Sequence, residues 1–322
     1  MKSSKNIFFK KDFISVEQFK QKKDLDAIFL LADKMQASIK KRQVKKVLKN
    51  FCITELFYQP STRTFTSFMA ASKFLGAITI PIHGMQAYSS AVKGETLPDT
   101  IRTVEQTTAC DLIILRHPEN SSSDIAAEFA SVPIVNAGSG SKEHPTQALL
   151  DLYTIKKKFK KIDGLKIILL GDLKYGRTAK SLAKLMSIYA KKIKLILVSP
   201  KDLRMPKEEI NKLKAKGVHL IQTENLKEVI GKADILYATR IQKEWFQKER
   251  KMALYNKLKD AYLINNKIMK KAKKKMILIH PLPRVGEIAA EVDKDPRSFY
   301  FEQMRNGLYI RMALLRLILL GE

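Results

Sequence analysis

The chain has 322 residues, 45 % of them hydrophobic and 8 % aromatic, and its 60 Lys and Arg against 32 Asp and Glu give a net charge of +28. Its length suits two soluble domains of about 150 residues each. No stretch approaches the roughly 20 apolar residues of a membrane span, and Met1–Lys20 lacks the apolar run of a signal peptide. These features argue against a membrane-spanning or secreted protein and favour a cytoplasmic one.

Short apolar or β-branched runs alternate with amphipathic segments along the whole chain. The amphipathic segments include Thr66–Leu75, Asp124–Phe129, Thr178–Ala190 and Pro206–Lys216. Continuous apolar strands that alternate with helices predict parallel sheets covered on both faces. The predicted strands are, in chain order, Phe51–Phe57, Ala77–Ile82, Leu112–Leu115, Ile134–Asn136, Lys166–Gly171, Lys194–Val198, His219–Gln222, Ile235–Ala238, Tyr262–Ile264 and Met276–Ile279.

The domain boundary is predicted at the helical stretch Pro145–Phe159, because the turn signal Asp163-Gly164 and a new strand follow it directly. Tyr300–Leu320 has the pattern of a long amphipathic helix with no strand of its own. We therefore expect an α/β protein of two doubly wound domains, each a parallel sheet flanked by helices. The domains would be residues 1–147 and residues 148–299, and the helix of residues 300–322 would pack back on the first domain.

The positive charge and the two cysteines can each be explained without a special binding partner or a special site. An excess of Lys and Arg can indicate nucleic acid or anionic membrane as a partner. Here the lysines stand in runs between apolar segments, as on a solvated surface, and no nucleic-acid-binding motif accompanies them. We predict neither nucleic acid nor membrane as a partner, and expect the field to attract small anionic substrates. Cys52 and Cys110 lack CxxC spacing, so we predict buried thiols in a reducing compartment rather than a disulfide or a metal site.

The first constellation with chemical meaning is Pro60–Thr64, between the strand Phe51–Phe57 and a helix predicted to begin near Thr66. A helix N-terminus offers unpaired N–H groups and a partial positive charge. Three hydroxyls and the Arg63 guanidinium placed there favour an anion site, most naturally for phosphate. A simple helix cap is the alternative, but a cap needs one hydroxyl and no arginine. A Walker loop is absent, which argues against a nucleoside triphosphatase.

Two further residues of the first domain follow strands. Arg116 ends the strand Leu112–Leu115 and could reach the same crevice, or equally form a surface salt bridge. His144 precedes a predicted helix, whose dipole would lower its pKa and keep it a neutral donor. Such a donor can polarise a carbonyl group, although a structural role for His144 is equally open.

In the second domain, Gly171–Thr178 follows a strand but lacks the GxGxxG pattern of a dinucleotide site. Arg177 in this segment and Arg240 at the end of another strand would each suit a carboxylate. Together they suggest a substrate with more than one carboxylate. The prolines of His280–Arg284 leave carbonyls that could accept hydrogen bonds from an amine, although a rigid turn is the favoured interpretation on the sequence alone.

Taken together, these segments resemble the transcarbamoylase family, and its aspartate branch in particular. The match covers nearly the whole chain in order. Leu282 favours the aspartate branch, since ornithine transcarbamoylases typically have the motif HCLP there, and so do Lys93 and the pair Arg240 and Gln242. The most specific motifs are STRT, HPTQ, GDLKYGRT, TRIQKE and HPLPRVGEIAAEVD, at residues 61–64, 144–147, 171–178, 239–244 and 280–293.

The resemblance implies that the α-amine of L-aspartate attacks carbamoyl phosphate to give N-carbamoyl-L-aspartate and phosphate, an early step of pyrimidine synthesis. The first domain would bind carbamoyl phosphate and the second aspartate, with no metal or organic cofactor. Two alternatives stay open: another amine acceptor such as ornithine, or a catalytically silent binding relative.

The resemblance also implies residue roles. The phosphate would be held by Ser61, Thr62, Arg63, Thr64, Ser89, Lys93 and Arg116. The carbonyl group would be polarised by Thr64, Arg116 and His144, and the carbamoyl amide held by Gln147. The aspartate carboxylates would be bound by Lys93, Arg177, Arg240 and Gln242. The carbonyls of Leu282 and Pro283 would orient the amine.

In this family Ser89 and Lys93 enter the neighbouring subunit's site, which implies a homotrimer with shared active sites and leaves regulatory chains open. Gln59 and Trp245 depart from the usual Glu and Arg, which help to hold the closed state of the two domains. We expect packing of Trp245 to replace that contact. Three further departures concern Phe65 and Met69, in place of Arg and Glu, and Glu143, in place of Gln beside His144.

Overall fold

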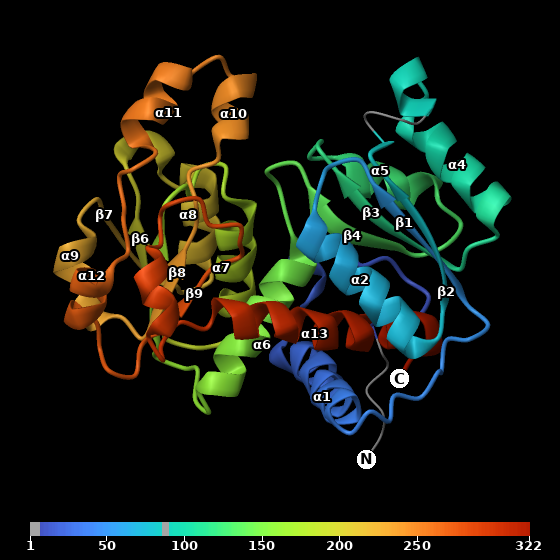
Figure 1. Cartoon of the computed structure of the whole chain (residues 1–322), viewed down its shortest axis with the longest axis horizontal. Helices are drawn as coiled ribbons and strands as arrows, with labels where there is room; N and C mark the ends of the chain where they lie inside the picture. The colour runs from blue at the N-terminus through green and yellow to red at the C-terminus, as the bar shows by residue number, and fades with distance from the viewer. Residues whose placement is uncertain (1–6, 86–89) are drawn as a thin grey trace. The chain divides into compact units, whose positions relative to one another are not determined.

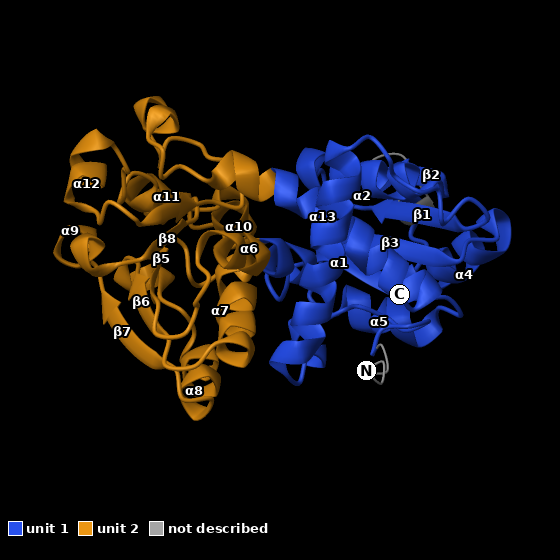
Figure 2. Cartoon of the chain, turned by 90° about the horizontal axis from the view of Figure 1, so that it is seen from below, with its two compact units in different colours: residues 1–150, 305–322 blue, residues 151–304 orange. Residues whose placement is uncertain are grey.

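The computed structural model describes residues 7–85 and 90–322, which form two compact units (Figures 1 and 2). Unit 1 is Met1–Leu150 with Arg305–Glu322, and unit 2 is Asp151–Met304. The chain passes from unit 1 to unit 2 within helix α6 (Pro145–Lys158) and returns within helix α13 (Tyr300–Leu320). The expected C-terminal helix on the first domain is thereby confirmed.

Unit 1 is built on a four-stranded parallel sheet with the order β2-β1-β3-β4. Its strands are β1 (Cys52–Phe57), β2 (Ile78–His83), β3 (Leu112–His117) and β4 (Ile134–Ser139). The helices around it are α1 (Lys22–Lys40), α2 (Thr62–Leu75), α4 (Leu97–Thr108) and α5 (Ser122–Phe129), with short 3₁₀ turns η1 (Val16–Gln18) and η2 (Ser90–Lys93). Helices therefore cover both faces of the sheet, as its apolar strands require.

The two faces of β1 show how the cover is divided. Leu56 packs in a cluster with Ile101 of α4 and Ala126 of α5. The next residue, Phe57, points to the opposite face, where its ring meets Phe65 of α2 at 5.3 Å. Helix α13 lies on the α2 side, because the Arg311 guanidinium stands 4.9 Å from the Phe68 ring.

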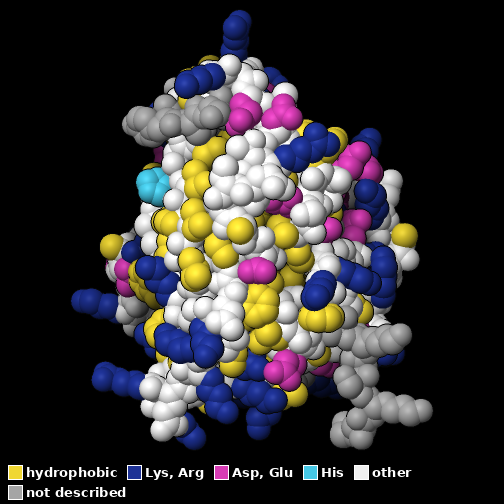
Figure 3. Space-filling model, turned by 90° about the vertical axis from the view of Figure 1, so that its right-hand side faces the viewer, with side chains coloured by type: hydrophobic (Ala, Val, Ile, Leu, Met, Phe, Trp, Pro, Cys, Tyr) yellow, Lys and Arg dark blue, Asp and Glu magenta, His cyan; other side chains and the backbone are white. Residues whose placement is uncertain are grey.

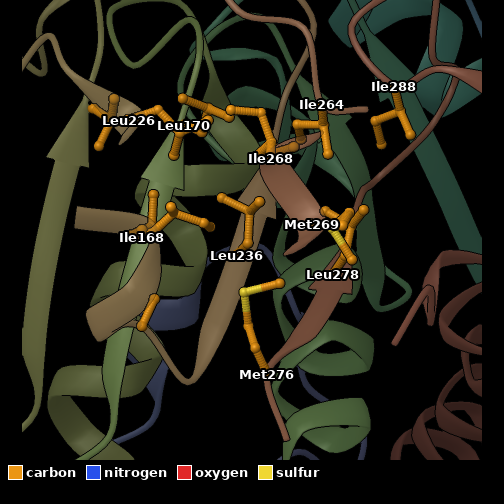
Figure 4. Close-up of a cluster of buried hydrophobic side chains, with 14 of the residues drawn as sticks. Ile168, Leu170, Leu226, Leu236, Ile264, Ile268, Met269, Met276, Leu278 and Ile288 are labelled. Atoms are coloured by element: carbon orange, nitrogen blue, oxygen red, sulfur yellow. The ribbon is translucent and has the colours of Figure 1, made fainter. Parts of the chain in front are cut away.

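Unit 2 is built on a five-stranded parallel sheet with the order β7-β6-β5-β8-β9. Its strands are β5 (Lys166–Leu170), β6 (Lys194–Val198), β7 (His219–Thr223), β8 (Ile235–Ala238) and β9 (Ile277–Ile279). Its helices are α7 (Arg177–Tyr189), α8 (Lys207–Ala215), α9 (Leu226–Val229), α10 (Lys243–Lys248), α11 (Met252–Leu258) and α12 (Asn266–Lys271). In Figure 4, strand residues of one face, such as Ile168 and Leu236, point into one core with Ile268 of α12.

Two details of the sequence prediction are wrong. Tyr262–Ile264 is not a strand: Ile264 makes one isolated bridge to Ile288, and its side chain enters the core (Figure 4). The short apolar run therefore indicated burial rather than sheet pairing. Helix α2 begins at Thr62 and not near Thr66, because Phe65 N already donates to Ser61 O at 3.0 Å.

Among the helices of residues 7–85 and 90–322, none combines the length and the apolar character that a membrane crossing requires.

An unusual carboxyl group lies in the core of unit 1. Glu55, in the middle of β1, is fully buried, and neither of its oxygens has a hydrogen-bond partner among the described residues. Burial raises the pKa of Glu55 to about 8, although Arg311 and Lys73 act in the opposite direction. Glu55 is therefore mostly protonated at neutral pH, because the core penalises its charged form.

Glu55 should make the stability of unit 1 depend on pH. Its pKa rises from the model-compound value of 4.5 to about 8 on folding, so the folded state binds more protons between these values. The free energy of unfolding should fall as pH rises through this window, by at most about 1.4 kcal/mol per pH unit. Glu55→Gln should flatten this slope in denaturant unfolding, whereas the exposed Glu128→Gln should keep it. Equal slopes for Glu55→Gln and the wild type would contradict a buried neutral carboxyl.

Candidate functional site

Both sheets have a point where the strand order reverses, and the chemical motifs gather there. The reversal lies between β1 and β3 in unit 1, and between β5 and β8 in unit 2. Ligands of open parallel sheets bind outside the carboxyl ends of the strands at such points. Pro60–Thr64 follows β1 and Arg116 lies in β3, while Gly171–Thr178 follows β5 and Thr239–Gln242 follows β8. The structure therefore brings the predicted motifs together in pairs, one pair in each unit.

In unit 1, Ser61–Thr64 form the first turn of helix α2. Ser61 is the N-cap residue, yet its side chain makes no capping hydrogen bond, and the first turn contains no acidic residue. Its hydroxyl is thus not used to start the helix, which disfavours the simple cap. The exposed Thr62 and half-buried Arg63 stand beside it. This arrangement suits an anion, because N–H groups, hydroxyls and a guanidinium share one helix end.

Thr64, His144 and Arg116 line the inner side of this cradle. Thr64 and His144 are both buried, and Thr64 Oγ1 lies 3.4 Å from His144 Nε2. Arg116 Nη1 donates to Ala137 O at 3.0 Å, and Arg116 O accepts from Tyr58 N at 2.9 Å, next to the cradle. Side chains from α2 and from the loop after β4 therefore meet at Thr64 and His144, while Arg116 of β3 is fixed against the backbone of β4.

The loop that carries His144 is held by the N-terminal segment of the chain. Glu143 Oε1 accepts from Ser15 Oγ at 2.9 Å, and Glu143 Oε2 accepts from Val16 N at 3.0 Å. The Glu143 carboxylate thus binds Ser15 and Val16, although Glu143 directly precedes His144 in sequence. Gly140 in the same loop has φ +44°, and a Cβ there would lie 2.0 Å from Asn120 Oδ1, so only glycine fits.

The remaining predicted residues of unit 1 stand as follows. Gln147 is buried in the first turn of α6, and its N–H donates to His144 O at 3.1 Å. Lys93 ends η2 with an exposed side chain. Ser89 lies outside the described residues. The residues predicted for the cradle that the structure describes in this unit are therefore Ser61–Thr64, Lys93, Arg116, His144 and Gln147.

In unit 2, Arg177 is the first residue of α7 and is half-buried. Burial lowers its pKa to about 10, so it stays charged at neutral pH. Gly176 before it must be glycine, because a Cβ there would lie 2.0 Å from Asp172 O.

Asp172 is a residue that the sequence analysis missed. It is fully buried, and its Oδ1 accepts from Lys174 N at 3.1 Å and Tyr175 N at 2.9 Å. Burial raises its pKa to about 6, while the backbone N–H groups of Tyr175, Gln242 and Lys174 lower it. Asp172 therefore joins the segment of Arg177 to the segment of Gln242. An Asp in a glycine-bounded turn after a strand was the available signal.

Arg240 already holds a carboxylate in this structure. Its Nη1 donates to Glu244 Oε2 at 3.0 Å and its Nη2 donates to Glu244 Oε1, a two-point contact. The contact has the two-point geometry in which arginine favours a carboxylate. Gln242 is the N-cap residue of α10 between them. A small hollow lies at the ends of β5 and β8, lined by Gly171 and Thr239 among others.

The His280–Arg284 segment follows β9 and is held by its own side chains. His280 Nδ1 accepts from Leu282 N at 2.8 Å, so Nε2 carries the proton and donates to Glu287 Oε1 at 2.7 Å. His280 N donates to Gln303 Oε1 at 2.8 Å. The peptide bond between Leu282 and Pro283 is cis. The segment is thus an ordered turn, and the orientation of an amine by its carbonyls stays a prediction.

Comparisons with known proteins match both units. A family model described as aspartate/ornithine carbamoyltransferase, carbamoyl-P binding domain, matches residues 11–157. A second, described as aspartate/ornithine carbamoyltransferase, Asp/Orn binding domain, matches residues 163–318.

Individual proteins match over nearly the whole chain. The aspartate carbamoyltransferase catalytic subunit of Thermococcus onnurineus is 45 % identical over 309 residues, 96 % of this chain and 97 % of that protein. Multifunctional protein pyr-3 of Neurospora crassa is 47 % identical over 98 % of this chain, which spans only 17 % of that longer protein. The crystal structure of aspartate transcarbamoylase from Trypanosoma cruzi in complex with N-(phosphonacetyl)-L-aspartic acid has a TM-score of 0.90 and 42 % identity, covering 97 % of each chain.

The cradle of unit 1 should bind inorganic phosphate through Arg63. Arg63→Ala should weaken binding at least about tenfold in calorimetric titration, because a charge-assisted hydrogen bond contributes roughly 1.5–3 kcal/mol. Arg305→Ala, which removes an exposed arginine of α13, should leave the affinity unchanged. Equal losses in both variants would mean that phosphate responds only to the net charge of the protein.

Proposed function

Because the chain belongs to the aspartate/ornithine carbamoyltransferase family, we propose that it transfers the carbamoyl group of carbamoyl phosphate to the α-amine of L-aspartate. The products are N-carbamoyl-L-aspartate and phosphate, in pyrimidine biosynthesis. The observation that carries the choice of acceptor is the two-point contact of Arg240 with the Glu244 carboxylate. A guanidinium that can take a carboxylate at two points suits the second carboxylate of aspartate, whereas ornithine has no carboxylate at its attacking end.

In the proposed mechanism, Ser61, Thr62, Arg63, Thr64 and Arg116 hold the phosphate group. Thr64, Arg116 and His144 polarise the carbonyl, which is supported by the 3.4 Å separation of Thr64 Oγ1 and His144 Nε2. Gln147 holds the carbamoyl amide. Positioned donors of this kind stabilise the negative charge that develops on the carbonyl oxygen in the transition state.

The acceptor is held by unit 2 in the same proposal. Arg177, Arg240 and Gln242 bind the two carboxylates, and the carbonyls of Leu282 and Pro283 orient the amine. The amine nitrogen forms a bond to the carbonyl carbon, and the bond from that carbon to the phosphate oxygen breaks. The departing phosphate takes up the proton of the amine, so no protein base is needed.

We propose the same division for the domains: residues 1–147 bind carbamoyl phosphate, residues 148–299 bind aspartate, and residues 300–322 return to the first domain. The descriptions of the two matching family models support this division. A cytoplasmic location is also proposed, since both Cys52 and Cys110 are free thiols, as in a reducing compartment.

A homotrimer with shared active sites is the proposed assembly, with Ser89 and Lys93 donated to a neighbouring subunit. The exposed Lys93 on η2 supports this. The edge strand β2 and the end of α2 expose large apolar side chains, with Ile78 58 % and Phe74 39 % exposed. Figure 3 shows hydrophobic side chains spread over the middle of this side of the molecule, with Lys and Arg gathered towards its lower part. Exposed apolar surface at a sheet edge is typical of an interface.

The acceptor is tested by assaying ureido product with aspartate and with ornithine. Aspartate should be the productive substrate, and Arg240→Ala should lower kcat/KM for aspartate by about a hundredfold or more, because a two-point charged contact is lost. The matched control is Arg204→Ala, which removes an arginine from an exposed pair with Glu224. Product from ornithine alone would assign the chain to another acceptor, and no product from either would indicate a silent relative.

Shared sites are tested by mixing two inactive variants. Lys93→Ala and His144→Ala should each lose most activity, since each lacks one part of every site. After dissociation and reassembly of an equal mixture, about a quarter of the sites should contain both wild-type residues. Recovery of activity in the mixture, with a trimeric mass by light scattering, is the expected result. No recovery in mixed trimers would rule out sites built from two subunits, and added mass in protein purified from its own cells would reveal regulatory chains.

A further inference from the structure

An aromatic stack joins the two carboxylate-binding segments of unit 2. The Trp245 and Tyr175 rings lie 5.9 Å apart between centroids and are nearly parallel, at 11°. Tyr175 stands two residues before Arg177, and Trp245 stands three residues after Gln242. Each ring therefore sits on the same short stretch of backbone as a residue proposed to bind aspartate.

The stack is reinforced by further contacts of the same elements. Phe246 meets the Tyr175 ring edge-on at 6.1 Å, and Tyr175 packs in a cluster with Phe246, Leu203 and Leu258. The Tyr175 hydroxyl donates to Glu249 Oε1 at 2.6 Å. Burial, with Glu249 beside it, raises the pKa of Tyr175, so the hydroxyl stays protonated as a donor.

Cations cover both rings of the stack. Lys248 Nζ lies 5.7 Å from the Trp245 ring, and Lys174 Nζ lies 4.8 Å from the Tyr175 ring. Such contacts favour the flat arrangement over a rotated ring, since the cation prefers the ring face. The α10–α11 segment is thus fastened to the turn before α7 by aromatic faces, in addition to the Tyr175–Glu249 hydrogen bond and the hydrogen bond from the Gln242 backbone to Asp172.

We propose that Trp245 is a positioning residue for the acceptor: its stack on Tyr175 sets the segment of Arg240 and Gln242 against the segment of Arg177. This inference rests on the proposed function. Binding two carboxylates needs both segments at a fixed separation, and a contact formed before binding spares the ligand the cost of ordering them. Loss of the stack should therefore weaken aspartate binding and leave carbamoyl phosphate binding intact.

The kinetic test uses a graded series at position 245. Trp245→Leu keeps an apolar side chain without a ring, and Trp245→Phe keeps a ring that can stack. Trp245→Leu should raise KM for aspartate about tenfold or more, with kcat changed less and KM for carbamoyl phosphate unchanged. Trp245→Phe should restore KM for aspartate to within about threefold of the wild type. Equal aspartate KM values in all three proteins would overturn the proposal, as would a parallel rise in both KM values.

A spectroscopic test needs no activity, because Trp245 is the only tryptophan of the chain. Tyr175→Leu removes the stacking partner and leaves Trp245 in place. The variant should show stronger acrylamide quenching of tryptophan fluorescence and a rise in aspartate KM similar to that of Trp245→Leu. The double variant should be no worse than either single one, since both remove the same contact. Additive losses would contradict action through the stack.

The two proposals fail in different ways. If the wild type makes no carbamoyl aspartate, the proposed function is wrong, and the proposed role of Trp245 falls with it whatever the fluorescence shows. If the wild type is active and Trp245→Leu has an unchanged aspartate KM, the function stands and the positioning role is wrong. If Trp245→Leu does not fold, Tyr175→Leu and Trp245→Phe still decide the matter by the same two KM values.

Discussion

In both units the chain first extends the sheet on one side of its first strand, by β2 in unit 1 and by β6 and β7 in unit 2, and then crosses to the other side of that strand, where β3 pairs with β1 and β8 with β5. The loops that leave neighbouring strands at such a crossing point run in opposite directions, so a hollow is left between them. The pairing of the phosphate cradle with Arg116, and of the Arg177 segment with the Arg240 segment, depends on this constraint. Phe57 of β1 pairs in register with Arg116 of β3, so the cradle and its arginine start from adjacent backbone positions. Leu170 and Ala238 are paired in the same way below the segments of Arg177 and Arg240.

A sheet brings the loops together but does not fix their conformations. In this protein buried side chains fix them. Glu143 accepts from the Val16 N–H, Asp172 from two N–H groups of its own turn, and His280 from the Leu282 N–H. Each acceptor satisfies backbone donors that are buried or partly buried, and an unpaired buried donor costs about 1–3 kcal/mol. The hydrogen bonds that satisfy the backbone groups of these loops therefore also fix the loop conformations.

The strands, both parallel sheets and the returning C-terminal helix could be predicted, because apolar runs and their alternation with amphipathic segments act locally. Motif positions after strands were predictable for the same reason. Contacts between segments far apart in sequence were not. Nothing in the neighbourhood of Ser15 indicates that it binds Glu143, 128 residues away. The protonation state of Glu55 likewise depends on its burial and on Arg311 of the distant helix α13. The strand prediction for Tyr262–Ile264 was wrong because a buried loop residue and a sheet strand can both produce the same short apolar run.

The aromatic departures from the family pattern follow one physical rule. A charge left unpaired in a protein interior is costly, so oppositely charged partners are best lost together, and we interpret in this way the departures expected from the resemblance, Gln59 with Trp245 and Phe65 with Met69. In both cases the new ring packs within its own unit: Phe65 against Phe57 and His83, at 5.3 and 5.5 Å, and Trp245 against Tyr175. Ring packing is short-ranged and insensitive to salt, whereas an ion pair is screened. An acceptor segment held by Trp245 should therefore keep its geometry at ionic strengths that would loosen a salt bridge.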